Sequence, residues 1–212
     1  MTSIPLKPQY GPTLGRLLEP RWRAAAPAAR AVVIAAGVAL LALAVGGALT
    51  LLDASYSHGG RVSFSFKYKG LYRTTPNPGG YVKVVRTSGG RVRASFAVAP
   101  IVLAPYAGSA TGELPLFAAA YARKLALRFP HFELKGEGKT RITSTLAGYD
   151  VRYRALVDGQ QMYGRDVMLL PPGHHVREGV VLEMLTDEHA SVARPVANSG
   201  VLEKPLKTFA FG

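Results

Sequence analysis

An uncharged apolar run near the N-terminus constrains this chain more than any other feature. Residues 31–52 read AVVIAAGVALLALAVGGALTLL, without one charged side chain. As an α-helix this run would measure about 33 Å, which is enough to cross a hydrocarbon core of about 30 Å. Only a helix pairs all backbone polar groups of such a segment in lipid. A cleaved signal peptide is the alternative, but its small-x-small site would fall inside the run, so we expect an uncleaved signal-anchor.

The charges that flank the run predict its orientation. Residues 1–30 contain five basic side chains and one acid, Glu19, whereas Asp53 and an uncharged stretch to Arg61 follow the run. The positive-inside rule therefore places the N-terminus in the cytoplasm. We expect a single-pass protein of the plasma (inner) membrane, with a basic cytoplasmic leader, a transmembrane helix, a linker and an extracytoplasmic domain at residues 1–30, 31–52, 53–60 and 61–212.

The remainder of the chain has the patterns of a mixed α and β domain. Apolar and polar residues alternate in several segments, which predicts half-buried strands. The strands are expected at residues 61–68, 81–87, 91–98, 132–135, 140–146, 149–157, 160–170 and 179–186. Ser88-Gly89-Gly90 and Asp158-Gly159 are hairpin turn sequences, so the sheet should be antiparallel. Helices are expected to open at residues 112–115 and run through Phe129, where Pro130 follows, and within 199–209. The fold class is therefore α+β, an antiparallel sheet covered by helices.

Motifs for catalysis are missing from the sequence. The chain has no cysteine, which excludes disulfides, thiolate metal sites and cysteine nucleophiles. The nucleophile and zinc-protease motifs G-x-S-x-G, S-x-x-K and H-E-x-x-H do not occur. The glycine-containing stretch at residues 136–139 is interpreted as a tight turn between strands, because a phosphate cradle would need a helix after it. We expect no cofactor and no resident metal.

A few titratable residues nevertheless leave an enzymatic alternative open. His174 and His175 lie near Glu178, and residues 187–189 read Asp-Glu-His, but neighbouring side chains on a loop diverge and a metal needs convergent ligands. Asp158 is explained by turn chemistry. For Asp166 we expect an exposed ion pair, with Arg165 or with a cross-strand partner, Arg152 or Arg154.

The charge distribution is the most distinctive feature of the outer domain. The chain carries a formal net charge of +13, and no acidic residue occurs between positions 54 and 112. A surface of one sign attracts anionic lipid headgroups, anionic wall polymer or an acidic protein. Interleaved tyrosines are typical of nucleic-acid platforms, but the predicted topology argues against nucleic acid. A merely solvated basic face is the other interpretation. The candidate binding residues are Arg61, Lys67, Lys69, Arg73, Lys83, Arg86, Arg91 and Arg93.

The segment from Glu113 to Thr186 resembles the PsbP-like superfamily, which includes extrinsic photosystem subunits, a Ran-binding import factor and mycobacterial LpqN-type lipoproteins. The resemblance lies in a mid-domain helix (LPLFAAAYARKLALRF), a hairpin containing Gly148, Tyr149, Val151, Tyr153, Asp158, Gly159, Gly164, Arg165, Asp166 and Val167, the strand VVLEML, and a final Lys207-Thr208-Phe209. It implies an α/β sandwich with an antiparallel sheet, and a non-enzymatic role in binding or in supporting a larger assembly.

These observations favour a membrane-anchored accessory or binding module. Its partners would be the lipid bilayer through the anchor, and an acidic protein or an anionic lipid or wall polymer through the basic residues. Two alternatives remain. One is a membrane-tethered envelope hydrolase that uses His174, His175 or the Asp158/Asp166 region. The other is a structural subunit of a membrane complex, paired through the small residues of the apolar run.

Overall fold

The computed structural model describes residues 27, 31–32, 34–40, 53–74, 78–105, 110–172, 177–191 and 193–212. The chain divides into two compact units, Met1–Thr50 and Leu51–Gly212. In the first unit, residues 31–32 and 34–40 are helical. Among the described residues, no helix is both long enough and apolar enough to cross a membrane. Residue 33 and residues 41–52 of the expected span lie outside the described residues, as does most of the leader.

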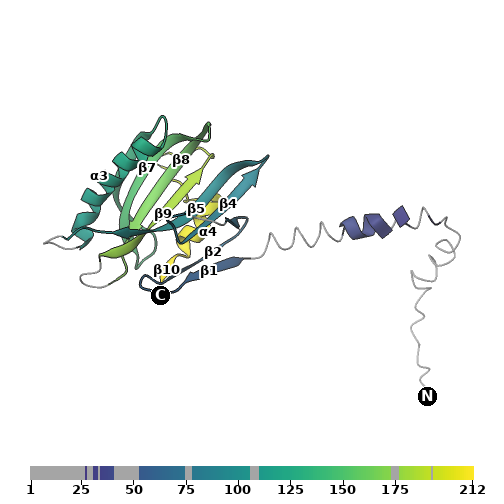
Figure 1. Cartoon of the computed structure of the whole chain (residues 1–212), viewed down its shortest axis with the longest axis horizontal. Helices are drawn as coiled ribbons and strands as arrows, with labels where there is room; N and C mark the ends of the chain where they lie inside the picture. Colours follow the sequence, from purple (N-terminus) through teal and green to yellow (C-terminus); the bar gives the residue numbers. More distant parts are fainter. Residues whose placement is uncertain are drawn as a thin grey trace, which may run out of the picture. The chain divides into compact units, whose positions relative to one another are not determined.

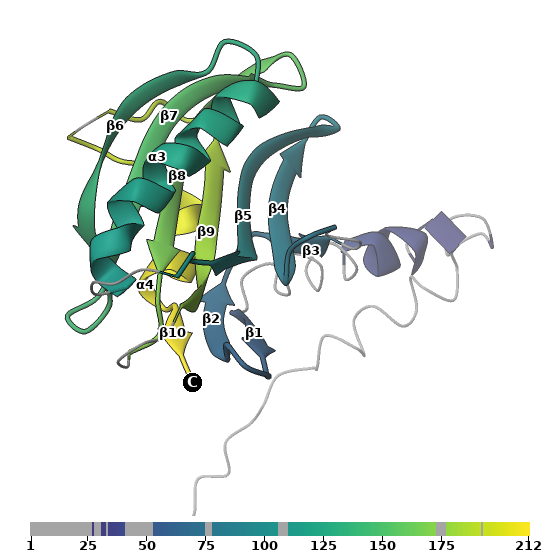
Figure 2. The ribbon, with the colours of Figure 1, turned by 60° about the vertical axis from the view of Figure 1, so that its left-hand side comes forward.

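Seven antiparallel strands form the larger sheet of the second unit (Figures 1 and 2). Their spatial order is β3-β4-β5-β9-β8-β7-β6, so the chain crosses over once, from β5 to β6 at the far edge, and then returns. The bounds are β3 Tyr72–Thr74, β4 Val82–Ser88, β5 Arg91–Val102, β6 Glu133–Arg141, β7 Ala147–Val157, β8 Gln160–Leu169 and β9 Glu178–Thr186.

One helix, α3 (Ala110–Arg128), covers one face of the larger sheet over β6 and β7 (Figure 2). Leu114, Ala118 and Leu125 of this helix are buried against Val151 of β7 and Met168 of β8. The small side chain of Ala118, which is fully buried, lets the helix approach the sheet closely. The acid Glu113 lies in the first turn and the base Arg128 in the last, the arrangement that the helix dipole favours.

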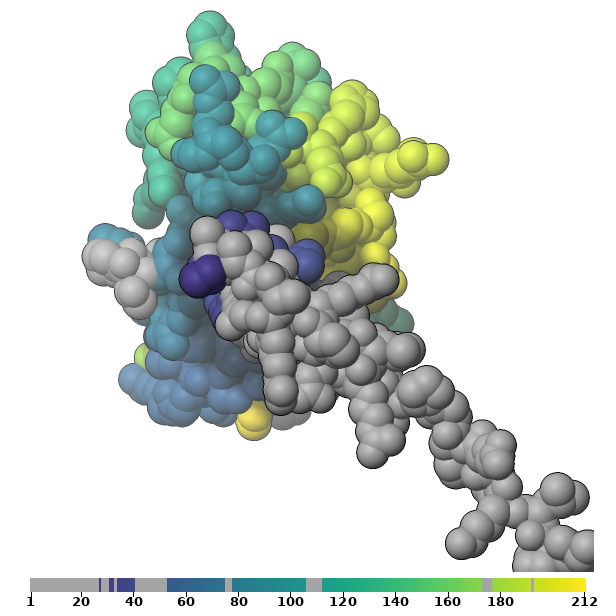
Figure 3. All heavy atoms as spheres, turned by 90° about the vertical axis from the view of Figure 1, so that its right-hand side faces the viewer, coloured from purple at the N-terminus to yellow at the C-terminus, as the bar shows by residue number. Residues whose placement is uncertain are grey.

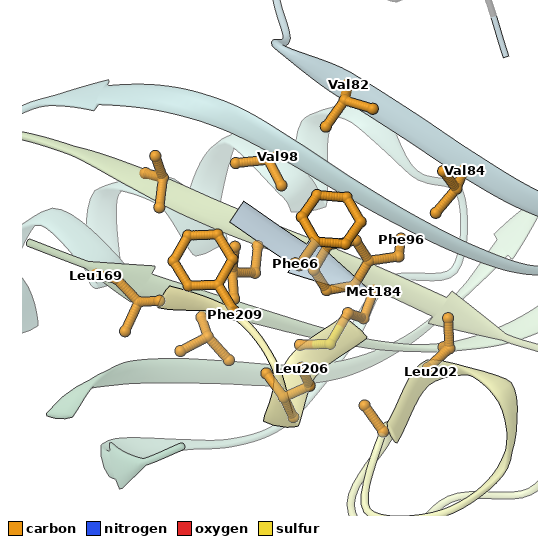
Figure 4. Close-up of a cluster of buried hydrophobic side chains, with 14 of the residues drawn as sticks. Phe66, Val82, Val84, Phe96, Val98, Leu169, Met184, Leu202, Leu206 and Phe209 are labelled. Atoms are coloured by element: carbon orange, nitrogen blue, oxygen red, sulfur yellow. The ribbon is translucent and has the colours of Figure 1, made fainter. Parts of the chain in front are cut away.

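A smaller three-stranded sheet and the C-terminal segment form the second core (Figure 4). Phe66 and Phe96 meet with ring centroids 4.9 Å apart, and Leu206 and Phe209 close the core from the C-terminal side. Each buried Phe contributes several kcal/mol, since truncating one to Ala typically costs about 3–5 kcal/mol. The elements are β1 Ala54–His58, β2 Phe64–Tyr68, β10 Ala210–Phe211, the 3₁₀ helix η1 Gly200–Leu202 and α4 Glu203–Lys207.

The mixed α and β architecture with antiparallel sheets agrees with the sequence expectation. The strands predicted at 81–87, 149–157 and 179–186 correspond to β4, β7 and β9. The two predicted hairpin turns are confirmed. Gly89, Gly90, Asp158 and Gly159 all have positive φ, which both central residues of a type I′ hairpin turn require.

Three local expectations were wrong. The 53–60 segment is not only a linker, because residues 54–58 form β1, which pairs with β2; Tyr56 packs there on Phe66 with centroids 5.6 Å apart. The stretch at 136–139 is not a turn: β6 runs through it, with a register shift between Leu134 and Gly136. Helix α3 also begins at Ala110, ahead of the expected start.

Candidate functional site

A pocket of about 280 Å³ lies on the face of the larger sheet opposite α3, between strands β6–β8 and the segment that follows β9. We call it the basic pocket. The polar residues that line it include Lys135 of β6, Arg152 and Arg154 of β7, Tyr163 of β8, and His189 and Ser191 of the following segment. Its apolar wall comes from that same segment through Ala190, Pro195 and Val196.

Strand alternation explains why β7 supplies two arginines to this pocket. Val151, Tyr153 and Ala155 are buried beneath α3, so Arg152 and Arg154, which alternate with them, project from the opposite face. The alternation was visible in the sequence. Tyr163 comes from β8, which the predicted Asp158-Gly159 turn joins to β7, whereas His189 and Ser191 come from a segment that no local pattern links to β7.

Four cations share two carboxylates around the pocket. Glu133 accepts hydrogen bonds from both Lys135 and Arg154. Asp150 accepts a hydrogen bond of 2.9 Å from Arg165 Nε, and its other oxygen lies 3.7 Å from Arg152 Nε, which is beyond hydrogen-bond distance. Positive charge is therefore in excess at this site.

Arg165 fixes the wall of the pocket. Its side chain is only 7 % exposed, and besides Asp150 it donates to Thr140 Oγ1 at 2.8 Å, Asn198 Oδ1 at 3.2 Å and the Val196 carbonyl at 3.3 Å. These bonds tie the segment after β9 to β6, β7 and β8. A buried guanidinium with a partner at each of its three nitrogens is a structural group, so the cations that line the cavity are Lys135, Arg152 and Arg154.

Two further contacts shape the site. Arg152 Nε is buried and has no hydrogen-bond partner among the described residues. A Cβ at Gly136 would lie 3.1 Å from an Arg152 guanidinium nitrogen, so this glycine gives the arginine its room beside β6. Across the pocket, the Tyr163 hydroxyl and His189 Nδ1 share a hydrogen bond of 2.9 Å.

A carboxyl pair, of which Asp166 is buried and Glu183 half-buried, lies under α3 on the other face of the sheet. Asp166 of β8 and Glu183 of β9 are direct cross-strand neighbours, and Asp166 is 1 % exposed. The Tyr121 hydroxyl donates to Glu183 Oε1 at 2.9 Å, and the Tyr153 hydroxyl to Asp166 Oδ2 at 3.4 Å. Burial, followed by the charge of Glu183, raises the pKa of Asp166 well above its ordinary value.

The expectation of an exposed ion pair at Asp166 was therefore wrong. Arg152, Arg154 and Arg165 occupy positions whose side chains project to the opposite face, because β7 pairs with β8 in a register that puts Arg152 across from Arg165 and Val151 across from Asp166. Adjacent residues in a strand cannot pair across one face. Asp158 is exposed in the β7–β8 turn, as turn chemistry predicts.

The structure distributes the eight predicted basic residues over several surfaces. Figure 3 shows β1 and β2 in blue below the teal strands β3–β5, with the yellow C-terminal segment beside them. On the β3–β4 ladder, Arg73 pairs with Val84 of the core face and contacts the Tyr56 ring at 5.1 Å, whereas Lys83 projects to the opposite face. Arg86 and Arg91 are exposed near the β4–β5 turn. The eight side chains do not share a single face.

Two of the eight have acidic partners at the ends of β9. Arg61 pairs with Glu178 at 2.8 Å, and Arg93 pairs with Asp187 at 2.7 Å. The sequence gap in acids from residue 54 to 112 therefore exaggerates the local positive charge, because β9 brings carboxylates from elsewhere in the chain.

Lys67 and Lys69 lie beside the residue at which the described part of the domain begins. Lys204 of α4 donates a hydrogen bond to Asp53, and this bond, with the charges of Lys69 and Lys67, lowers the pKa of Asp53 below its ordinary value. We call Lys67, Lys69 and Lys204 the junction lysines. Asp53 directly follows the apolar run in the sequence.

The two histidines of the metal-like cluster, His174 and His175, lie outside the described residues. Within the described part of the chain, no group of three or more potential ligands is placed to hold a metal ion.

Comparison with known proteins gives a similar fold and no sequence relative. No protein-family model matches the chain, and no curated protein does. A crystal structure of LpqN, a Mycobacterium tuberculosis protein involved in cell-envelope biogenesis, aligns with a TM-score of 0.50 at 8 % identity, over 75 % of this chain and 91 % of that one. A Pseudomonas aeruginosa protein of unknown function gives 13 % identity over 64 % and 86 % of the two chains, but its TM-score of 0.32 is too low to carry an argument. The domain thus has an LpqN-like fold.

Proposed function

We propose that this protein is a single-pass, membrane-anchored accessory module of the cell envelope, which acts by binding and not by catalysis. The N-terminus lies in the cytoplasm, and a domain of PsbP-like fold lies outside it. The observation that carries the proposal is the apolar run of residues 31–52, which ends one residue before the described domain begins. The LpqN-like fold supports a location in the envelope, since LpqN is involved in envelope biogenesis.

The junction lysines support a contact between the domain and the membrane surface. Lys67, Lys69 and Lys204 lie beside Asp53. Because Asp53 directly follows the apolar run, an anchor formed by that run would hold Asp53 at the membrane surface. Each Lys near an anionic leaflet contributes about 1 kcal/mol of attraction. The basic residues of β3–β5 that form no ion pair within the described part of the chain would remain available to an acidic protein or wall polymer.

Alkaline extraction of membranes tests the anchor. The wild-type chain should remain in the membrane pellet, because removing an integral helix from lipid is unfavourable. A variant with Leu41→Arg and Val45→Arg should move to the soluble fraction, since each charge at the centre of the span costs about 2.5–3.5 kcal/mol. A variant with two arginines placed in the leader instead, Pro5→Arg and Pro8→Arg, is the control and should stay in the pellet. Extraction of the wild-type chain with the soluble proteins would contradict the proposal.

A further inference from the structure

We infer that the basic pocket binds a small organic anion, with a phosphate or carboxylate head at Arg152 and a short apolar body against the wall formed by Ala190, Pro195 and Val196. The inference names the class of ligand that the proposed binding module would take, and it rests on the proposed function only for that role. The geometry of the pocket does not depend on the anchor.

The charge balance calls for an anion. Glu133 is shared by Lys135 and Arg154, and Asp150 is engaged by Arg165 at 2.9 Å. Arg152 Nε stands 3.7 Å from Asp150 Oδ1, so Arg152 shares this carboxylate with Arg165 and is the more distant of the two cations. Its side chain is only 26 % exposed, so water compensates the charge less well than at the surface.

The buried Nε of Arg152 needs an acceptor. Leaving a buried donor unpaired costs about 1–3 kcal/mol, and more for a charged group. A phosphate or carboxylate would accept from Nε and a terminal nitrogen together, because the planar guanidinium fork matches two oxygens of such an anion. The bare backbone of Gly136 beside the guanidinium keeps this fork close to β6.

The size and lining of the pocket define the rest of the ligand. A volume of about 280 Å³ is at the lower end of the range for small-molecule sites, which excludes a long acyl chain as the whole occupant. The segment after β9 supplies apolar wall, and Arg165 fixes that wall by its bond to the Val196 carbonyl. A compact ring or short aliphatic group fits this surface.

Fluorine NMR of small probes tests the inference on the full-length chain in nanodiscs of uncharged lipid. The probes are 4-fluorophenyl phosphate, 4-fluorobenzoate and the uncharged 4-fluorobenzyl alcohol. At least one anionic probe should broaden and saturate, and the two anions together show which head group the site prefers. The alcohol should bind at least tenfold more weakly, because it lacks the charge that Arg152 recognises.

Three variants assign the binding to the pocket. Arg152→Gln should weaken binding of the preferred anion at least tenfold, whereas Arg91→Gln, which removes the same charge from an exposed hairpin, should change it less than twofold. Ala190→Trp fills the apolar part without altering a charge and should also abolish binding. This last variant decides the question if Arg152→Gln fails to fold.

Several outcomes would overturn the inference. They are the absence of saturable binding by both anions, equal losses in Arg152→Gln and Arg91→Gln, and unchanged binding in Ala190→Trp. The assay reads ligand binding whether or not the chain is inserted in lipid. Failure of membrane anchoring and failure of anion binding are therefore separate results.

Discussion

At the scale of single residues, the pair formed by the buried Asp166 and the half-buried Glu183 is the most unusual feature. Two carboxyl groups on adjacent strands lie beneath a helix, and the hydroxyls of Tyr121 and Tyr153 donate to them. Ionising Asp166 in this environment is unfavourable, because burial removes its solvation and the charge of Glu183 repels it. The folded protein therefore holds a proton at Asp166 more tightly than the unfolded chain does.

This difference makes stability depend on pH in a defined direction. The pKa of Asp166 is raised on folding, so the free energy of unfolding falls as pH rises from the ordinary pKa of an aspartate up through the raised value. Asp166→Asn should therefore be more stable than wild type at pH 7, by about 1–2 kcal/mol, with the difference shrinking toward pH 3. Denaturant unfolding of the full chain across this range measures it.

Asp158→Asn is the matched control, because Asp158 is exposed in a turn and its replacement should change stability by less than about 0.5 kcal/mol at every pH. A less stable Asp166→Asn at pH 7, or a difference that does not vary with pH, would show that the pKa of Asp166 is not raised in the folded protein.

At the scale of elements, the hairpin β7–β8 is held by a close contact between strand and ring. Gly164 is the cross-strand partner of Tyr153, and a Cβ on Gly164 would come within 2.2 Å of the Tyr153 ring. Gly164→Ala should therefore destabilise the protein by about 1–3 kcal/mol, as overpacking does.

Gly138→Ala gives the comparison, since Gly138 lies in the neighbouring strand β6, where an added Cβ would meet nothing within 4 Å. This variant should be neutral or slightly stabilising, because alanine reduces the freedom of the unfolded chain. Thermal unfolding of both variants is the measurement. Equal stability of the two would contradict the contact at Gly164.

Elements with strong alternation or strong turn chemistry could be predicted from the sequence, and the others could not. Strand β7 alternates apolar and polar residues from Tyr149 onward and is followed by the turn Asp158-Gly159, so the sequence predicted both the strand and its end. Strand β1 has serines between weak apolar positions, and its stability comes from rings of β2, which no local pattern reveals. In β6, two glycines imitate a turn, while pairing with β7 extends the strand through them.

The residues of the candidate site show the same division between what local patterns reveal and what tertiary packing decides. The arginines of β7 were visible as one face of a strand, but their neighbours come from β6 and from the segment after β9. Asp166 was misassigned because its sequence neighbour Arg165 suggested an ion pair, whereas strand geometry puts adjacent side chains on opposite faces. Burial of a carboxyl group beneath a helix depends on tertiary packing and left no sequence signal.

At the scale of the whole molecule, the uneven charge distribution predicts where partners attach. Reversing the charge of two junction lysines, with Lys67→Glu and Lys69→Glu, should reduce the material that co-purifies with the gently solubilised chain at low salt. High salt should have the same effect on the wild-type chain, because screening weakens the attraction that charge reversal removes. The same reversal at Arg86 and Arg91 tests the β4–β5 end separately. Co-purification that ignores both pairs of substitutions and the salt concentration would show that the basic residues are only solvated.

The proposed topology places the N-terminus inside the cytoplasm and the domain outside it. Because the chain has no cysteine, single-cysteine variants report the location of one residue each. Ser3→Cys probes the leader, and Ser144→Cys probes the exposed turn between β6 and β7. A membrane-impermeant maleimide should label Ser144→Cys in cells whose inner membrane is intact, and Ser3→Cys only after that membrane is broken. Labelling in the reverse order, or labelling of both positions only after lysis, would contradict the account.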